Sequence, residues 1–300
     1  MGSPLRKYSS LVIMVALLFL GISAPLYSGS GASAAAPLYA PASPNTYVIL
    51  VHGYSPGDTS GTPSSGTWTC GVNFESQLIS AGYTVGVVSY YGEFTITFSN
   101  GYTYTNSSFF GTANTPIQNI GAQLGMAMSR VFTSGTTSLD IVAHSMGGLV
   151  TLYALEHYYN PYISLKNVIF IASPFGGSPF ANVAQYLGLS GIVGYEAYQM
   201  VGGSSFLTGL QNNLGNAFSN YPGFVWTVFA GNYDPWWGYL FFNGANDGVV
   251  SVNSATYLGY NNLYVFPDLH TGFLDSFTWF GVSYFQDQNV ASTMLYVLGN

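Results

Sequence analysis

Charged side chains are scarce in this 300-residue sequence: Asp, Glu, Lys and Arg together make up 5% of it, against about a quarter in typical soluble proteins. Four residues are Lys or Arg, and two of these, Arg6 and Lys7, stand near the N-terminus. A chain without a basic face cannot neutralise the phosphates of DNA or RNA, so nucleic-acid binding is excluded. The uncharged polar surface is typical of exported proteins of acidophiles, although any secreted protein with a polar coat would share it.

Cysteine is also rare in this sequence. Cys70 is the sole cysteine of the sequence, so no disulfide can form within the chain and its stability must come from packing. No base that would activate a thiolate lies beside it in the sequence, so we expect a buried free thiol rather than a nucleophile. Hydrophobic residues make up 48% of the sequence, which is enough for a sizeable core.

The first 36 residues have the pattern of a secretory signal peptide. Arg6 and Lys7 precede the apolar run 11–20, and the small residues of 32–36 offer cleavage sites. The apolar run is short for a membrane span, and an uncleaved N-terminal anchor is the alternative. We therefore expect a secreted protein whose functional domain is formed by residues 37–300.

Apolar strand patterns alternate with helical patterns along that domain. The run 46–51 is continuously apolar, as expected of a parallel strand that is buried on both faces, and residues 166–172 are a further candidate for a buried strand. Helical patterns cover 71–81 and 115–132. The alternation predicts an α/β fold with a mostly parallel central sheet and helices on both faces, which binds ligands at the carboxyl ends of its strands.

Two segments interrupt the alternation. Residues 92–112 alternate between polar and aromatic around Asn100-Gly101, which predicts an antiparallel hairpin excursion at the edge or the top of the sheet. Residues 175–223 are rich in glycine and aromatics and contain a single charged residue, Glu196. We interpret this segment as a lid or cap over an apolar site; the alternative is a loosely helical surface insertion.

Ser145 lies where a strand pattern ends and a helix pattern begins. The residues around it, Ala143-His144-Ser145-Met146-Gly147, have the layout of a nucleophile elbow, in which small residues two before and two after the serine permit a tight turn. The start of the helix would also supply backbone N–H groups for an oxyanion. A serine that merely caps the helix would give the same local pattern.

A serine nucleophile needs a histidine base and an acid, which follow it in that chain order with the acid first. Of the four histidines, His52 and His144 precede Ser145, and His144 is expected to point away from the site. His157 lies on the following helix, far from the turn, which leaves His270 as the base. Two aspartates, Asp234 and Asp247, remain as candidates for the acid.

Four separated stretches make the chain resemble bacterial and archaeal lipases of the α/β-hydrolase superfamily, especially those with Ala-His-Ser-Met-Gly-Gly at the elbow. The stretches are 51–53, 143–148, 172–179 and 246–250. The third departs from the family, which commonly has His-Arg or His-Lys where this chain has Phe175-Gly176. The resemblance extends from about residue 46 to 275 and does not cover the hairpin or the lid.

The resemblance implies roles for individual residues. Asp247, in the Asn-Asp-Gly stretch, would be the acid of the triad. The backbone N–H groups of Met146 and Tyr54 would form the oxyanion hole, Gly53 would let the loop approach the nucleophile, and His52 would support that loop through a hydrogen bond.

The resemblance further implies cleavage of carboxylic esters, especially lipid or acyl esters, through an acyl-enzyme. The same triad serves thioesterases and acyltransferases, and a non-catalytic cell-envelope protein on a hydrolase scaffold is the alternative from another class. No cofactor is expected, and calcium, which some relatives bind, would have only Asp234 and Asp268 as weak ligands. Interfacial contact with a lipid surface would accompany a lipid substrate.

Overall fold

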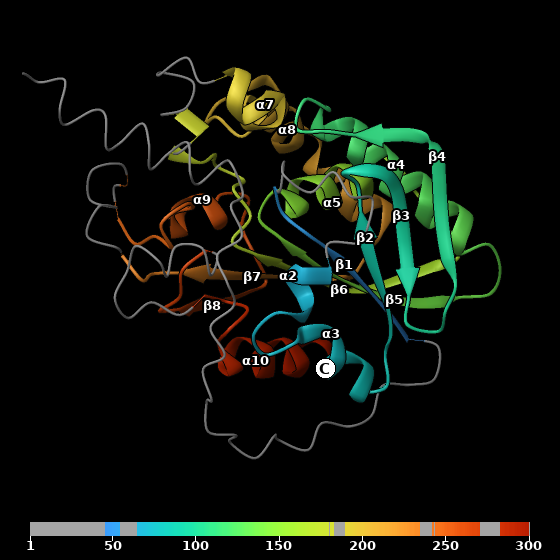
Figure 1. Ribbon diagram of the computed structural model, residues 1–300. Helices are drawn as coiled ribbons and strands as arrows, with labels where there is room; N and C mark the ends of the chain where they lie inside the picture. Colours follow the sequence, from blue (N-terminus) through green and yellow to red (C-terminus); the bar gives the residue numbers. More distant parts are fainter. Residues whose placement is uncertain are drawn as a thin grey trace, which may run out of the picture.

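The centre of the molecule is an eight-stranded sheet. In the computed structural model its strand order is β4-β3-β2-β1-β5-β6-β7-β8 (Figure 1). Every neighbouring pair from β2 to β8 is parallel, which confirms the mostly parallel sheet expected from the sequence. The strands are β1 (Thr46–Val51), β2 (Thr84–Ser89), β3 (Gly92–Phe98), β4 (Thr103–Gly111), β5 (Thr137–His144), β6 (Ile163–Ile171), β7 (Val225–Gly231) and β8 (Asn262–Phe266).

The structure describes residues 46–54, 65–179, 181–182, 190–234, 242, 244–270 and 283–299. The signal peptide or anchor expected over residues 1–36 lies outside these ranges. Within them, no helix has the length and apolar character that crossing a membrane requires.

Helices cover both faces of the sheet. In Figure 1, α4, α5 and α8 lie on one face, and α3 and α10 lie on the other. The helices are α2 (Ser65–Thr69), α3 (Phe74–Ser80), α4 (Ile117–Val131), α5 (Met146–His157), α7 (Ser190–Gln199), α8 (Ser205–Asn220), α9 (Val252–Ala255) and α10 (Gln288–Leu298).

Strand β1 shows why the central strands read as unbroken apolar runs. Ile49 and Val51 belong to the core under α4, α5 and α8, whereas Val48 and Leu50 belong to the core under α3 and α10. Because successive side chains of a strand point to opposite faces, a strand between two cores needs an apolar residue at every position. Cys70, expected to be buried, is half-buried, with its Sγ 3.3 Å from the carbonyl oxygen of Thr67.

The segment 92–112 forms a hairpin at one edge of the sheet. Its strands, β3 and β4, pair antiparallel with each other, and β3 pairs antiparallel with β2. Gly101, in the turn between them, has φ +89°, a backbone conformation that favours glycine. The hairpin thus extends the central sheet.

The segment 175–223, expected as a lid or cap, contains one helix of the main helical layer. Helix α8 buries Leu207 and Ala217 in the core that it shares with α5, and it leads from β6 towards β7. Its glycines, Gly209 and Gly215, face open space rather than a contact, so the glycine content of the sequence does not indicate a loose insertion here. Helix α8 therefore belongs to the main helical layer, although it falls within the segment expected to form a lid or cap.

Glu156, in the last turn of α5, is a buried carboxyl group. It is 3% exposed, and neither carboxyl oxygen has a hydrogen-bond partner among the described residues. The imidazole Nδ1 of His157 is 3.9 Å from Oε2. Burial raises the pKa of Glu156 from 4.5 to about 8, because the charged form loses its hydration.

Glu156→Gln is expected to flatten the pH dependence of stability. A carboxyl group whose pKa is raised by folding stabilises the native state fully below pH 4.5, and this contribution is lost as the pH rises towards about 8. In the wild type the free energy of unfolding should fall over that interval by on the order of 2 kcal/mol from this group. Urea unfolding at both ends of the interval would measure it. Glu93→Gln, an exposed carboxyl on β3, is the control, and an unchanged slope in Glu156→Gln would contradict the prediction.

Candidate active site

Ser145 lies in a strained turn between β5 and α5. Its φ of 53° and ψ of −127° fall in a region that residues with a Cβ rarely adopt, at a cost of about 1–3 kcal/mol. The turn is held from behind, since the Ser145 N–H donates a 2.8 Å hydrogen bond to the carbonyl oxygen of Ile171 at the end of β6. Backbone strain of this kind between a strand and a helix is the geometry of a nucleophile elbow.

Two glycines let the end of β1 pass next to this turn. A Cβ on Gly53 would lie 2.8 Å from the Cβ of Ser145, and a Cβ on Gly147 would lie 2.3 Å from the carbonyl oxygen of His52. Both distances are shorter than any contact between real side chains. Gly147 is thus needed because of the neighbouring backbone at the end of β1, in addition to the tight turn expected from the sequence.

The side chains of Ser145, His270 and Asp247 form a hydrogen-bonded chain. Nε2 of His270 is 2.9 Å from Oγ of Ser145, and Nδ1 of His270 is 2.8 Å from Oδ2 of Asp247. Their exposed fractions are 6% for Ser145, 4% for His270 and 0% for Asp247. A buried hydroxyl, imidazole and carboxylate in this order have the arrangement that nucleophilic catalysis by serine requires.

Asp247 is fixed by four donors. Oδ1 accepts hydrogen bonds from the backbone N–H groups of Val249 at 2.9 Å and Val250 at 2.7 Å. Oδ2, which faces His270, also accepts a 3.1 Å hydrogen bond from the hydroxyl of Tyr284. Both oxygens of the carboxylate are therefore oriented, and Oδ2 is directed at the imidazole.

Sequence reasoning missed Tyr284, which lies far along the chain from Asp247 and carries no motif. The side chain is fully buried, and Gly231 at the end of β7 leaves room for it, because a Cβ there would lie 2.4 Å from the tyrosine oxygen. Burial and the nearby Asp247 raise the pKa of Tyr284 well above its usual value, so the phenol remains a hydrogen-bond donor.

His144, expected to point away from the site, contacts the base from behind. Its Nε2 lies 3.2 Å from the carbonyl oxygen of His270, and the two imidazole rings are 4.8 Å apart. Burial, together with the neighbouring imidazoles of His270 and His52, lowers the pKa of His144 well below its usual value. A neutral His144 with its proton on Nε2 would donate to that carbonyl and help to hold the segment that carries His270.

The two expected oxyanion donors lie on either side of the nucleophile. Met146 is the first residue of α5, so its N–H has no carbonyl one helical turn earlier to bond. Tyr54 directly follows Gly53, whose close approach brings this loop to the Cβ of Ser145. The residues that would supply both donors are thus positioned next to Ser145.

His52 and Tyr90 support the loop before Tyr54. Nδ1 of His52 is 2.7 Å from the carbonyl oxygen of Gly53. The ring of Tyr90 stacks on the imidazole of His52 with centroids 3.9 Å apart, and its hydroxyl donates hydrogen bonds to the carbonyl oxygens of His52 and Gly53. The sequence indicated the role of His52 but gave no sign of Tyr90, because it lies at the end of a different strand.

Asp234, one of the two residues considered as calcium ligands, contacts Asn246. Oδ1 of Asp234 accepts hydrogen bonds from the backbone N–H of Asn246 at 2.8 Å and from its side-chain amide at 3.0 Å, next to the acid Asp247. Asp268 is buried. In the described part of the chain, no three His, Cys, Asp or Glu side chains are grouped so that they could share a metal ion.

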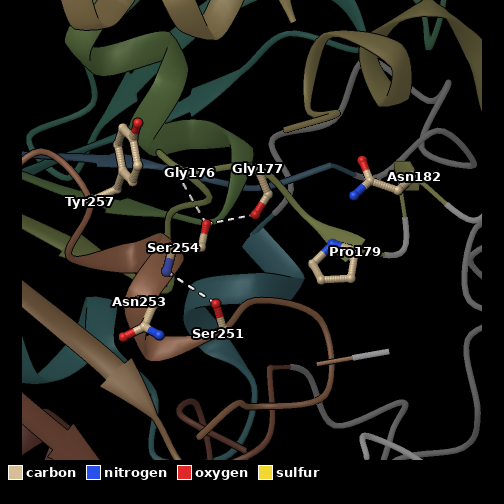
Figure 2. Close-up of a pocket in the computed structure, with 8 residues that line it drawn as sticks. All are labelled: Gly176, Gly177, Pro179, Asn182, Ser251, Asn253, Ser254 and Tyr257. Carbon is tan, nitrogen blue, oxygen red and sulfur yellow. Dashed lines mark hydrogen bonds between the residues drawn. The ribbon is translucent and has the colours of Figure 1, made fainter. Parts of the chain in front are cut away.

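A pocket of about 220 Å³ lies beside the segment that carries Asp247, between α9 and the loop after β6 (Figure 2). The hydroxyl of Ser254 donates to the carbonyl oxygen of Gly177 at 2.6 Å, and that of Ser251 accepts from the N–H of Ser254 at 3.1 Å. The hydroxyl of Ser178 donates to the carbonyl oxygen of Val249 at 2.9 Å. These contacts hold the segment that carries Asp247 against the loop after β6.

Comparisons with known proteins identify the fold. No protein-family model matches the chain, and no curated protein sequence matches it. Among solved structures, it is similar to the mature lipase BlEst2 of Bacillus licheniformis, with 19% identity over 78% of this chain and 88% of that one and a TM-score of 0.51. It is also similar to the metagenomic carboxyl esterase MGS0156, with 15% identity over 98% and 90% of the chains and a TM-score of 0.51.

The lin2722 product of Listeria innocua is similar as well, with 17% identity over 85% of this chain and 94% of that one and a TM-score of 0.51. At such low identities these likenesses concern the fold rather than the chemistry. They agree with the parallel sheet, with its antiparallel edge, and with the strand–turn–helix at Ser145. The chain has the fold of the α/β-hydrolase superfamily.

Proposed function

We propose that the protein is a serine hydrolase that cleaves carboxylic esters through an acyl-enzyme. The observation that carries this proposal is the hydrogen-bonded chain from Ser145 through His270 to Asp247, with distances of 2.9 and 2.8 Å. The strained backbone at Ser145 also supports it. Such strain lowers the stability of the fold, and it is typical of a turn that presents a nucleophilic serine to a histidine base.

The mechanism follows from the contacts of each residue. The hydroxyl of Ser145 attacks the ester carbonyl while Nε2 of His270 accepts its proton, and the N–H groups of Met146 and Tyr54 stabilise the oxyanion. His270 then gives the proton to the leaving alcohol, and the acyl group stays on Ser145. A water molecule, deprotonated by His270, releases the acid. Asp247 stabilises the imidazolium in both steps through its contact with Nδ1.

Acyl esters, including lipid esters, are the proposed substrate class. The similar structures are described as a lipase and a carboxyl esterase. The test is hydrolysis of nitrophenyl esters of increasing acyl length, with an acyl thioester alongside. A rate that rises with chain length would indicate a lipase, and one that falls would indicate an esterase for short chains.

A fluorophosphonate probe separates this enzyme from a non-catalytic protein on the same scaffold. The probe reacts with a serine that a histidine activates, so we expect stoichiometric labelling of Ser145. If Ser145 is not labelled and no ester is hydrolysed at any pH at which the protein is folded, the proposal fails.

We also propose that the enzyme acts outside the cell, because the N-terminal residues have the signal-peptide pattern. Contact with a lipid surface is part of this proposal, whereas no cofactor is required by the mechanism. N-terminal sequencing of the protein recovered from the medium and from the membrane would test the location, including the alternative of an uncleaved anchor.

A further inference from the structure

Glu196, on α7, is a fully buried carboxyl group with a single partner. It is 0% exposed, and its Oε2 accepts a 2.6 Å hydrogen bond from the hydroxyl of Tyr91. Its Oε1 has no hydrogen-bond partner among the described residues. Neither of the described cations, Arg130 and Lys166, forms an ion pair with it. A buried carboxylate with one donor and no cation is costly, so the proton should stay on this group over a wide pH range.

Tyr91 connects this carboxyl group to the loop that would supply an oxyanion donor. The ring of Tyr91 lies 5.2 Å from the ring of Tyr90 and 5.8 Å from that of His52. Tyr90 in turn donates hydrogen bonds to the carbonyl oxygens of His52 and Gly53. A continuous series of contacts thus connects Glu196 on α7 with Gly53, the residue before Tyr54.

Helix α7 is otherwise docked by uncharged contacts with the loop between β4 and α4. The N–H of Glu196 donates to the carbonyl oxygen of Ala113 at 3.1 Å, and the N–H of Ile117 donates to the side-chain oxygen of Gln199 at 2.6 Å. Gly194 passes so close that a Cβ would lie 2.3 Å from the same Ala113 oxygen. A small displacement of α7 would therefore break several contacts together.

We propose, relying on the hydrolase function above, that Glu196 is a positioning residue of the oxyanion loop. In its neutral form it keeps α7 packed against Tyr91 and so keeps Tyr54 in place. Its ionisation puts a charge with a single donor in the core, and hydration of that charge requires α7 to move. The titratable groups that face it are Tyr91 and Tyr90, which follow β2, and Tyr54, which follows β1.

The pH at which the contact loosens follows from the burial of Glu196. Burial raises the pKa of this group to about 8, although the hydrogen bond from Tyr91 acts in the opposite direction. The carboxyl group is thus neutral in acid and at neutral pH and ionises at mildly alkaline pH. Tyr54 and Tyr90 stay protonated in that range, because burial and the nearby Glu196 raise the pKa of both hydroxyls.

Glu196→Gln tests the proposal, because an amide keeps an acceptor for Tyr91 and cannot ionise. The kcat/KM of the wild type for a nitrophenyl ester should fall about tenfold above pH 8, as expected when an oxyanion donor is displaced by a fraction of an ångström. Glu196→Gln should lack this alkaline fall. Glu156→Gln is the matched control: its carboxyl group is also buried, with 3% exposed, and burial raises its pKa similarly, but it lies at the far end of α5 and should leave the fall unchanged. Rates of the Ser145→Ala protein correct for spontaneous hydrolysis.

Two further measurements keep the proposal falsifiable. Tyr91→Phe removes the hydrogen bond that lowers the pKa of Glu196, so the alkaline fall should move to higher pH, which checks the result if Glu196→Gln folds poorly. Hydrogen exchange of the α7 amides, compared between wild type and Glu196→Gln at the same pH, should show protection lost only in the wild type above pH 8. Equal alkaline falls and equal exchange in the two proteins would overturn the proposal. A wild type that hydrolyses no ester at any pH but shows the difference in exchange would refute the hydrolase function and leave the role of Glu196 in docking α7.

Discussion

Ser145→Ala is expected to lower kcat/KM for ester hydrolysis by about 10⁴- to 10⁶-fold. The alanine has no oxygen to attack the carbonyl, and the hydrogen bond that His270 makes to Oγ at 2.9 Å disappears. The fold should be preserved, because alanine keeps the Cβ and the backbone N–H still donates to Ile171. The measurement is the initial rate with a nitrophenyl ester, together with the thermal unfolding curve of both proteins.

Ser173→Ala is the matched control for that experiment. Ser173 follows β6 at the same rim of the sheet and is fully buried, yet its Oγ has no hydrogen-bond partner among the described residues. We expect its replacement to change kcat/KM by less than about threefold, as for a residue outside the reacting groups. Hydrolysis by Ser145→Ala within about tenfold of the wild type would show that another group is the nucleophile.

Asp247→Asn is expected to lower kcat/KM by about 10⁴-fold with little change in structure. The N–H groups of Val249 and Val250 require an acceptor at the position of Oδ1, so the side-chain oxygen of asparagine will take that position. Its NH₂ group then replaces Oδ2 and faces Nδ1 of His270, 2.8 Å away in the wild type. Nδ1 must now accept a hydrogen bond, which places the proton on Nε2, where it prevents His270 from accepting the proton of Ser145.

Asp234→Asn is the control for the acid. Asparagine can still accept the two hydrogen bonds that Asn246 donates to Oδ1 of Asp234, so kcat/KM should stay within about tenfold of the wild type. A loss from Asp234→Asn as large as that from Asp247→Asn would mean that the acid is wrongly assigned, or that the two aspartates act as one unit. Crystal structures of both variants would distinguish these outcomes.

The parts of the fold that the sequence predicted are those that local patterns encode. The apolar run 46–51 coincides with β1, because a strand covered on both faces leaves no polar gap. Strand β6 begins at Ile163, three residues before the expected start at residue 166. Lys166 is exposed there, and it interrupts the pattern. Helix α3 begins at Phe74 rather than at residue 71, since Asn73 has φ 53° and caps the helix by accepting from Ser76.

The residues that could not be predicted from the sequence lie far along the chain from the residues that they contact. The nucleophile and the base followed from chain order, and the choice of Asp247 over Asp234 came from the family resemblance. Tyr284 and Glu196 have no motif, and their roles depend on which strand or helix lies beside them in the fold. Residues 205–220 were included in the expected lid because their segment is rich in glycine. Glycines in a helix can face open space, and composition alone does not distinguish this from a flexible insertion.

The bridge between Leu269 and Ser283 joins the two ends of the segment 271–282. These residues pair in parallel, and Tyr284 also donates to the carbonyl oxygen of Leu269, so the chain leaves after His270 and returns at adjacent points. A segment whose two ends are clamped together can be exchanged for one of different length at little entropic cost. An exchange of residues 271–282 for a segment of different length is therefore expected to leave His270 in place.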